Sequence, residues 1–141
     1  MHTGELTLAS IIGVIGSFIA SLFGGWTSDL QTLIVFMCVD FTMGLALAIF
    51  FKKSNKTVSG TLSSKAAWTG LCRKCITLLL VLVAHRLDVT LGVDYIKTAT
   101  IIAFIVVELI SIIENAGLMG VPIPKVITSV IDVLKKRAGE E

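Results

Sequence analysis

Charged side chains are scarce in this sequence and are missing from long stretches of it. Lys, Arg, Asp and Glu make up 16% of the 141 residues, whereas apolar residues make up 55%. The mean hydropathy is +0.92. A soluble domain of this length interrupts its apolar runs with charge more often, so the long uncharged runs indicate a membrane protein. The length fits one domain, and the net charge of +2 is too small to indicate nucleic acid binding.

Cysteine is also scarce, with three residues in the chain. Cys72 and Cys75 form a C-x-x-C pair, but a structural zinc site needs four ligands, and no second Cys or His pair lies on that side. A redox C-x-x-C belongs to a soluble βαβ context, which the sequence lacks. We therefore interpret the cysteines as reduced apolar residues and expect neither a metal nor another cofactor.

The N-terminal segment lacks the marks of a cleaved signal peptide. Residues Met1 to Glu5 contain no Lys or Arg, and no convincing small-x-small cleavage site precedes Gly24. A signal peptide has both features, so we expect this segment to be retained.

Four apolar segments are long enough to be considered as transmembrane helices, because a bilayer needs about 20 apolar residues, with a range of roughly 17 to 25. The third is the weakest, since its uninterrupted apolar part, Ile76 to Ala84, has nine residues. It spans only if Arg73, Lys74 and Arg86 direct their charges toward the membrane surfaces. We predict an all-α membrane protein with four transmembrane helices, or three if the first does not cross. The expected spans are 6–23, 30–51, 75–91 and 95–113.

The first segment carries small residues at a spacing of four. Such rows let helix backbones approach closely and drive helix association in lipid, although a weak, flexible span has the same composition. The residues expected to pack against another helix are Gly13, Gly16, Ser17 and Ala20.

The basic residues predict the orientation. Ten of the twelve Lys and Arg residues fall on one side of a four-span protein, whereas the opposite turns carry Asp29 and Asp94. The positive-inside rule then places both termini in the cytoplasm. The loop 52–74 contributes Lys52, Lys53, Lys56, Lys65, Arg73 and Lys74, and the tail contributes Lys125, Lys135, Lys136 and Arg137.

Two amphipathic segments are expected on this basic side. Residues Lys65 to Cys75 fit a short helix at the membrane interface, with Trp68 as its anchor. The tail 125–137 has an apolar face and a charged face, so it fits a helix that lies on the membrane, packs against a partner or forms a solvated cap.

Two acidic residues lie deep inside the apolar segments. Asp40 is about ten residues from each end of its segment, and Glu108 is 13 residues after Tyr95. Each carboxylate costs roughly 2.5–3.5 kcal/mol at a helix centre on insertion scales. Arg86 and Lys97 are roughly 10 Å or more away in depth, by helical rise, so we expect no direct buried ion pair. Either the acids are protonated, or they face water or a bundle interior in an assembly.

Each acid begins a polar or small stripe on its helix. We expect these stripes to line a pore or a seam between subunits, while hydrogen bonds between helices of one protomer remain the alternative. Four helices enclose no large lumen, so a lumen would need many copies. The stripes are Asp40, Gly44 and Ala48, then Glu108, Ser111 and Asn115, and a separate polar cluster at the opposite membrane end comprises His85, Arg86 and Asp88.

Three stretches carry a resemblance that covers the chain from about Leu33 to the tail. They are VDFTMGLALAIFFKK, LSSKAAWTGLCRKCITLLLVLVAHRLD and VELISIIENAGLMGVPIPK, and the run ENAGLMGVPIPK is the most specific part. Together they resemble the phage lysis and toxin-secretion holin family, which includes the clostridial toxin-secretion holins. The chain departs from that pattern at Val107, where a polar Asn is expected.

The resemblance implies a small, non-enzymatic phage or prophage protein of the bacterial cytoplasmic membrane. It would form large homo-oligomers in the lipid and open lesions that release an endolysin or a large toxin, without required contact with that cargo. Two other functions stay open. One is a small ion or proton channel, or a transporter subunit, that uses Asp40 and Glu108. The other is a membrane adaptor that anchors a partner through the tail helix.

Overall fold

The structure is a computed structural model that describes residues 2–139, in which all the regular secondary structure is helical. It confirms the predicted all-α class, and four of the helices are long and apolar enough to cross a membrane. The elements are α1 (His2–Leu22), α2 (Ser28–Ala46) with a continuing π-helical turn η1 (Leu47–Phe51), α3 (Ser64–Leu91), α4 (Ile96–Leu118) and α5 (Lys125–Ala138).

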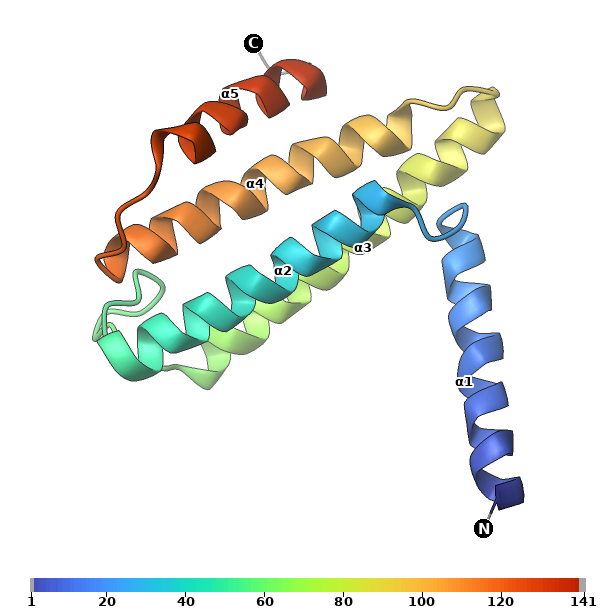
Figure 1. The fold of residues 1–141 in the computed structure, drawn as a ribbon, viewed down its shortest axis with the longest axis horizontal. Coiled ribbons are helices and arrows are strands. Elements are labelled where there is room, and N and C mark those ends of the chain that lie inside the picture. Colours follow the sequence, from blue (N-terminus) through green and yellow to red (C-terminus); the bar gives the residue numbers. More distant parts are fainter. Residues whose placement is uncertain (1, 140–141) are drawn as a thin grey trace.

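Helices α2, α3 and α4 run alongside one another and form the bundle (Figure 1). Each presents a buried stripe at the three- and four-residue spacing of a helix face. The stripe of α4, for example, passes through Ile101, Ile105 and Glu108. The apolar core comprises Leu30, Leu33, Met37, Val81, Ile101 and Ile105.

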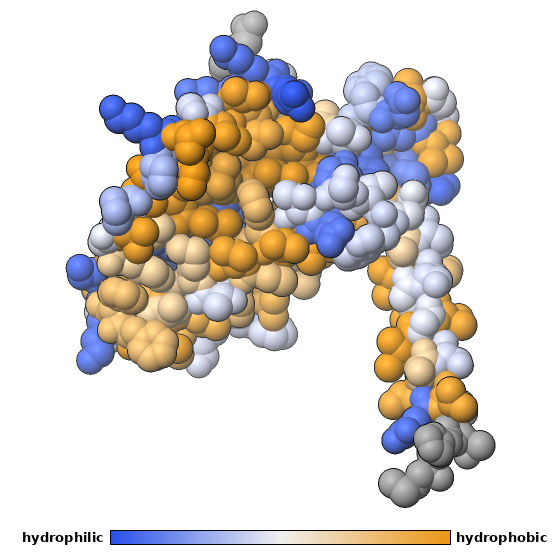
Figure 2. Space-filling model, viewed as in Figure 1, coloured by the Kyte–Doolittle hydropathy of each residue, from blue (hydrophilic) through white to orange (hydrophobic). Residues whose placement is uncertain are grey.

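Helix α1 leaves this bundle and extends away from it (Figure 1). Its apolar span Gly4–Leu22 is 0% buried, and its apolar side chains are visible along the arm in Figure 2. The turn after α1 contains Gly24, with a φ of +76°, and Gly25, with a φ of +98°. The Lys97 ammonium donates a hydrogen bond to the Phe23 carbonyl and so ties the end of α1 to α4.

Helix α3 is longer than expected. One helix of 28 residues runs from Ser64 to Leu91. The predictions of a separate interfacial helix at Lys65 to Cys75 and of a helix that starts at residue 75 are therefore wrong. The N-cap of α3 is Ser63, whose hydroxyl accepts a hydrogen bond from the Ala66 amide at 3.4 Å. No proline interrupts the helix, and serine is a preferred N-cap, so the helix continues through the positions that were assigned to a loop.

The loop between η1 and α3 is therefore short, covering residues 52–63. Lys52 ends the preceding helix in a left-handed conformation with a φ of +50°. Gly60 closes the loop, since its carbonyl accepts from the Ser54 amide at 3.0 Å. A β-carbon at Gly60 would come within 2.2 Å of the Lys52 carbonyl oxygen, so glycine is required there.

The predicted amphipathic tail helix is present as α5, and it turns back along α4 (Figure 1). Leu134 packs against the bundle core. Because of this reversal, α5 lies alongside the bundle and ends away from the 52–63 loop (Figure 1).

Candidate functional site

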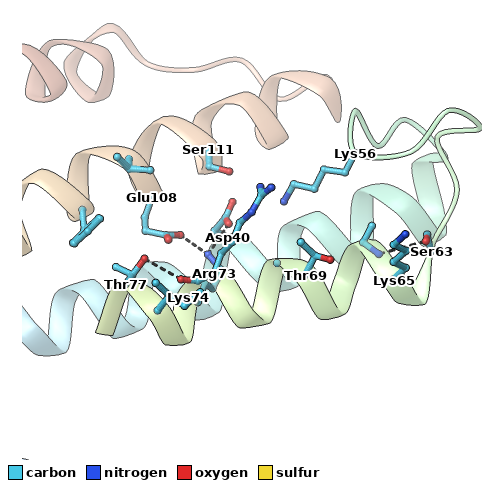
Figure 3. A pocket seen from close by; sticks show the side chains of 15 residues that line it. Asp40, Lys56, Ser63, Lys65, Thr69, Arg73, Lys74, Thr77, Glu108 and Ser111 are labelled. Atoms are coloured by element: carbon cyan, nitrogen blue, oxygen red, sulfur yellow. Dashed lines mark hydrogen bonds and ion pairs between the residues drawn. The ribbon is translucent and has the colours of Figure 1, made fainter. Parts of the chain in front are cut away.

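The centre of the bundle contains a charged cluster that joins three helices. The Lys74 ammonium on α3 lies 2.8 Å from an oxygen of Asp40 on α2 and 2.6 Å from an oxygen of Glu108 on α4 (Figure 3). Asn115 on α4 donates to the other Asp40 oxygen at 3.0 Å. We call Asp40, Lys74, Glu108 and Asn115 the charged cluster.

The side chains of the charged cluster are largely buried. Asp40 is 4% exposed, Glu108 8% and Asn115 3%, while the Lys74 side chain is 14% exposed. One cation faces two carboxylates, so the cluster has a formal charge of −1 if both acids are ionised. Removing one partner from a buried ion pair typically costs about 3–5 kcal/mol, because it leaves an uncompensated charge. The cluster therefore resists separation of the three helices.

The expectation that neither acid has a basic partner at its own depth is wrong. It rested on a third span that begins near Cys75, which left Lys74 at the membrane surface. Since α3 begins at Ser64, Lys74 lies ten residues inside the helix. The same error placed Lys74 among the interfacial basic residues, whereas its ammonium points into the bundle.

The sequence contained a signal for this partner. Lys74, Val81 and Asp88 are seven residues apart on α3, a spacing that returns a helix to nearly the same face. Val81 and Asp88 are both buried, so this face points inward. Asp40, Glu108 and Asn115 take part in hydrogen bonds between helices of one protomer, the kind of contact that the sequence left as the alternative to a seam between subunits.

The other residues of the two predicted stripes lie around the charged cluster. Ser111 lies beside Glu108 in an open groove of about 820 Å³. Gly44 and Ala48 line a smaller hollow of about 50 Å³ beneath the 52–63 loop. The Lys56 ammonium lies 3.9 Å from the position that a β-carbon on Gly44 would occupy.

The remaining predicted residues stay apart from the charged cluster. On α1, Gly13, Gly16 and Ser17 are exposed and Ala20 is partly exposed. Trp68 is 67% exposed on the outside of α3. Four of the residues predicted to form the basic side, Lys52, Lys53, Lys65 and Arg73, are exposed near the end of the bundle that carries the 52–63 loop.

The three residues of the polar cluster at the other end of the bundle make different contacts. Asp88 is buried and accepts hydrogen bonds from the Ile96 and Lys97 amides, both at 2.9 Å, so it caps the start of α4. His85 packs against Gly24, and Arg86 is exposed. Sequence reasoning missed the contact of Lys97 with Phe23, because nothing local marks it.

Metal chemistry receives no support from the side chains described here. Among residues 2–139, no three His, Cys, Asp or Glu side chains lie together as a metal site would require. Cys38, Cys72 and Cys75 are free thiols.

Comparison with known proteins gives consistent matches over most of the chain. A model of the bacteriophage holin family matches residues 17–136. A probable holin of Bacillus phage phi105 is 34% identical over 117 residues, which cover 82% of this chain and 80% of that protein. An uncharacterized protein of Halalkalibacterium halodurans is 34% identical over 137 residues, covering 93% of this chain and 96% of the relative.

An uncharacterized protein of Listeria monocytogenes is 32% identical over 127 residues, covering 89% of this chain and 85% of the relative. No solved structure matches the chain. The family match includes every residue of the charged cluster and all of α2, α3 and α4. This chain is therefore a member of the bacteriophage holin family.

Proposed function

We propose that this protein permeabilises the bacterial cytoplasmic membrane from within and releases a phage endolysin, or a large toxin, without catalysing a reaction. Membership of the holin family supports a holin role, and four apolar helices support a membrane location. The charged cluster is the observation that carries the proposed mechanism. Its ion pairs place polar groups in the interior of a three-helix bundle that is closed within a single protomer.

The charged cluster accounts for a harmless dispersed state. Both acids are ion-paired with Lys74 within one protomer, so isolated copies do not place unpaired carboxylates against lipid. Separation of α2, α3 and α4 would leave these groups unpaired in a medium that offers no hydrogen bonds. Opening is therefore favoured only where water or another protomer replaces the lost partners. In the assembled state, Asp40 and Glu108 would line the seam between subunits.

Helix α1 is suited to bring copies together. Its span Gly4–Leu22 is 0% buried, so its whole circumference is available to lipid or to a neighbour. The small residues around Gly13 and Gly16 allow close approach of a second helix. We propose that α1 packs against a neighbouring copy during assembly.

The proposed orientation places the 52–63 loop and the turn between α4 and α5 on the cytoplasmic side. The Lys-rich loop and the start of α3 lie at one end of the bundle (Figure 1), and the positive-inside rule assigns such an end to the cytoplasmic side. The family supports an origin in a phage or a prophage.

Induced expression in bacteria with a co-expressed cytoplasmic endolysin tests the function. We expect growth arrest followed by abrupt lysis and release of the enzyme. Depolarisation without enzyme release would instead indicate a narrow ion channel. An adaptor would give a different result. The intact chain would not permeabilise the membrane, and deletion of α5 would abolish whatever effect its expression has on the cell.

The role of the acids is tested in the same assay with Asp40→Asn and Glu108→Gln. Each removes one charge of the cluster while keeping the side-chain size, so we expect a changed lysis time. Thr42→Val is a matched control, because Thr42 is exposed on α2 and, among the described residues, its hydroxyl bonds only to the Cys38 carbonyl of its own helix. Lysis on the wild-type schedule in both acid variants would remove the charged cluster from the mechanism.

A further inference from the structure

An open groove runs from the start of α3 toward the charged cluster, between α3, α4 and the 52–63 loop (Figure 3). We propose that this groove binds the phosphate of an anionic membrane lipid, with part of an acyl chain lying along its deeper, apolar end. The inference concerns a lipid site of the single protomer, so it does not depend on the proposed release of an endolysin.

The charge of the groove favours an anion. Four basic side chains and two carboxylates line it, which leaves a net formal charge of +2. Both carboxylates, Asp40 and Glu108, are already bound by Lys74. Lys56, Lys65 and Arg73 form no ion pair with any residue in the described part of the chain. Three cations therefore face one groove without a protein anion to neutralise them.

The geometry directs two of these cations to one place. Lys56 reaches in from the loop and Arg73 from α3, and both side chains point into the groove above Asp40 (Figure 3). The Lys56 ammonium lies over Gly44 of α2, 3.9 Å from the position that a β-carbon there would occupy. Lys65 and Ser63 lie at the mouth, where the N-terminus of α3 adds the positive end of a helix dipole.

The opposite end of the groove explains why the anion belongs to a lipid. Ile76, Phe104 and Val107 line that end, and Ile76 and Val107 are 56% and 58% exposed. A free phosphate would make no use of these apolar side chains. A phospholipid presents a phosphate and an acyl chain in the same order as the basic and apolar parts of the groove. Basic pockets between transmembrane helices are known to hold anionic headgroups in this way.

The test measures lipid retention on the full-length protein by native mass spectrometry in a neutral detergent. Equimolar phosphatidylglycerol and phosphatidylcholine compete in one arm, and millimolar inorganic phosphate is added in a second. We expect preferential retention of one phosphatidylglycerol, unaffected by inorganic phosphate. The double variant Lys56→Gln/Arg73→Gln should retain it about 25-fold less, at roughly fivefold for each basic residue near an anionic headgroup.

The control is Lys125→Gln/Lys136→Gln, which removes the same charge from exposed positions of α5 outside the groove. We expect retention like that of the wild type. The proposal is overturned if phosphatidylcholine is retained equally, if the two double variants lose phosphatidylglycerol to the same extent, or if inorganic phosphate displaces it. Because Lys56 and Arg73 are exposed, an unchanged melting temperature will confirm that their variant is folded.

Discussion

The ammonium of Lys74 and the carboxylate of Glu108 lie 2.6 Å apart, although 33 residues separate them along the chain. This contact joins α3 to α4, and the second contact of Lys74 joins both helices to α2 through Asp40. One lysine thus pairs with two acids that would each be unfavourable in lipid without a partner. Ion pairs hold the three helices together at the charged cluster, and aliphatic packing holds them together in the apolar core.

Replacement of Lys74 by Met should be the most destabilising single change in the charged cluster. It leaves two facing carboxylates without a cation, so we expect a loss of about 3–5 kcal/mol, measured as the free energy of unfolding in detergent. Arg73→Met is the control, because Arg73 is exposed and forms no ion pair with the described residues. It should change stability by less than about 0.5 kcal/mol.

The triple variant Asp40→Asn/Lys74→Met/Glu108→Gln separates charge from shape. It removes all three charges together, so we expect most of the stability lost in Lys74→Met to return. Equal unfolding free energies for Lys74→Met and Arg73→Met would contradict the importance of the ion pairs.

Asp88 should matter for the start of α4. Asp88→Ala removes the acceptor for two backbone amides, those of Ile96 and Lys97, and we expect a loss of about 1–2 kcal/mol. Amide hydrogen exchange at Ile96 and Lys97 should become faster. Asp94→Ala, an exposed acid in the same turn, is the control and should leave that exchange unchanged. Unchanged protection in Asp88→Ala would show that the cap is dispensable.

Gly24 should tolerate a side chain less well than its neighbour. A β-carbon at Gly24 would lie 2.4 Å from the Cε1 atom of His85, whereas one at Gly25 would meet nothing within 4 Å. Both glycines have positive φ, so Gly25→Ala reports the backbone strain alone. Gly24→Ala should lose roughly 1–3 kcal/mol more than Gly25→Ala, because overpacking adds to that strain.

His85→Ala provides the internal check on this clash. The double variant Gly24→Ala/His85→Ala should be closer in stability to Gly25→Ala than Gly24→Ala is, since the imidazole is gone. Thermal denaturation in detergent measures all four proteins. Identical melting temperatures for Gly24→Ala and Gly25→Ala would show that His85 moves aside freely.

The proposed association through α1 makes a prediction for its small residues. Gly13→Leu/Gly16→Leu should prevent close approach of a second helix and reduce cross-linked oligomers in membranes several-fold. Val14→Leu/Ile15→Leu is the control, because it changes large exposed residues of the same arm. Since α1 lies outside the bundle, the monomer should melt at the wild-type temperature in both variants. Equal oligomer yields would exclude the small residues from assembly.

The sequence by itself determined the helical class, the four apolar segments, the amphipathic tail and the positions of Asp40 and Glu108 well inside two of those segments. These features depend on local quantities: the length of an apolar run, its periodicity and the position of a residue within it. The resemblance to holins was also contained in the sequence, and the family comparison confirms it.

Tertiary structure alone decided which groups meet. The start of α3 at Ser64 moved Lys74 from the membrane surface into the bundle, and only the arrangement of three helices placed its ammonium between two acids. The same holds for the reversal of α5, the departure of α1 and the convergence of Lys56 and Arg73 in one groove. A helix face can be read from spacing, but the neighbour that it meets depends on packing with residues far away in the chain.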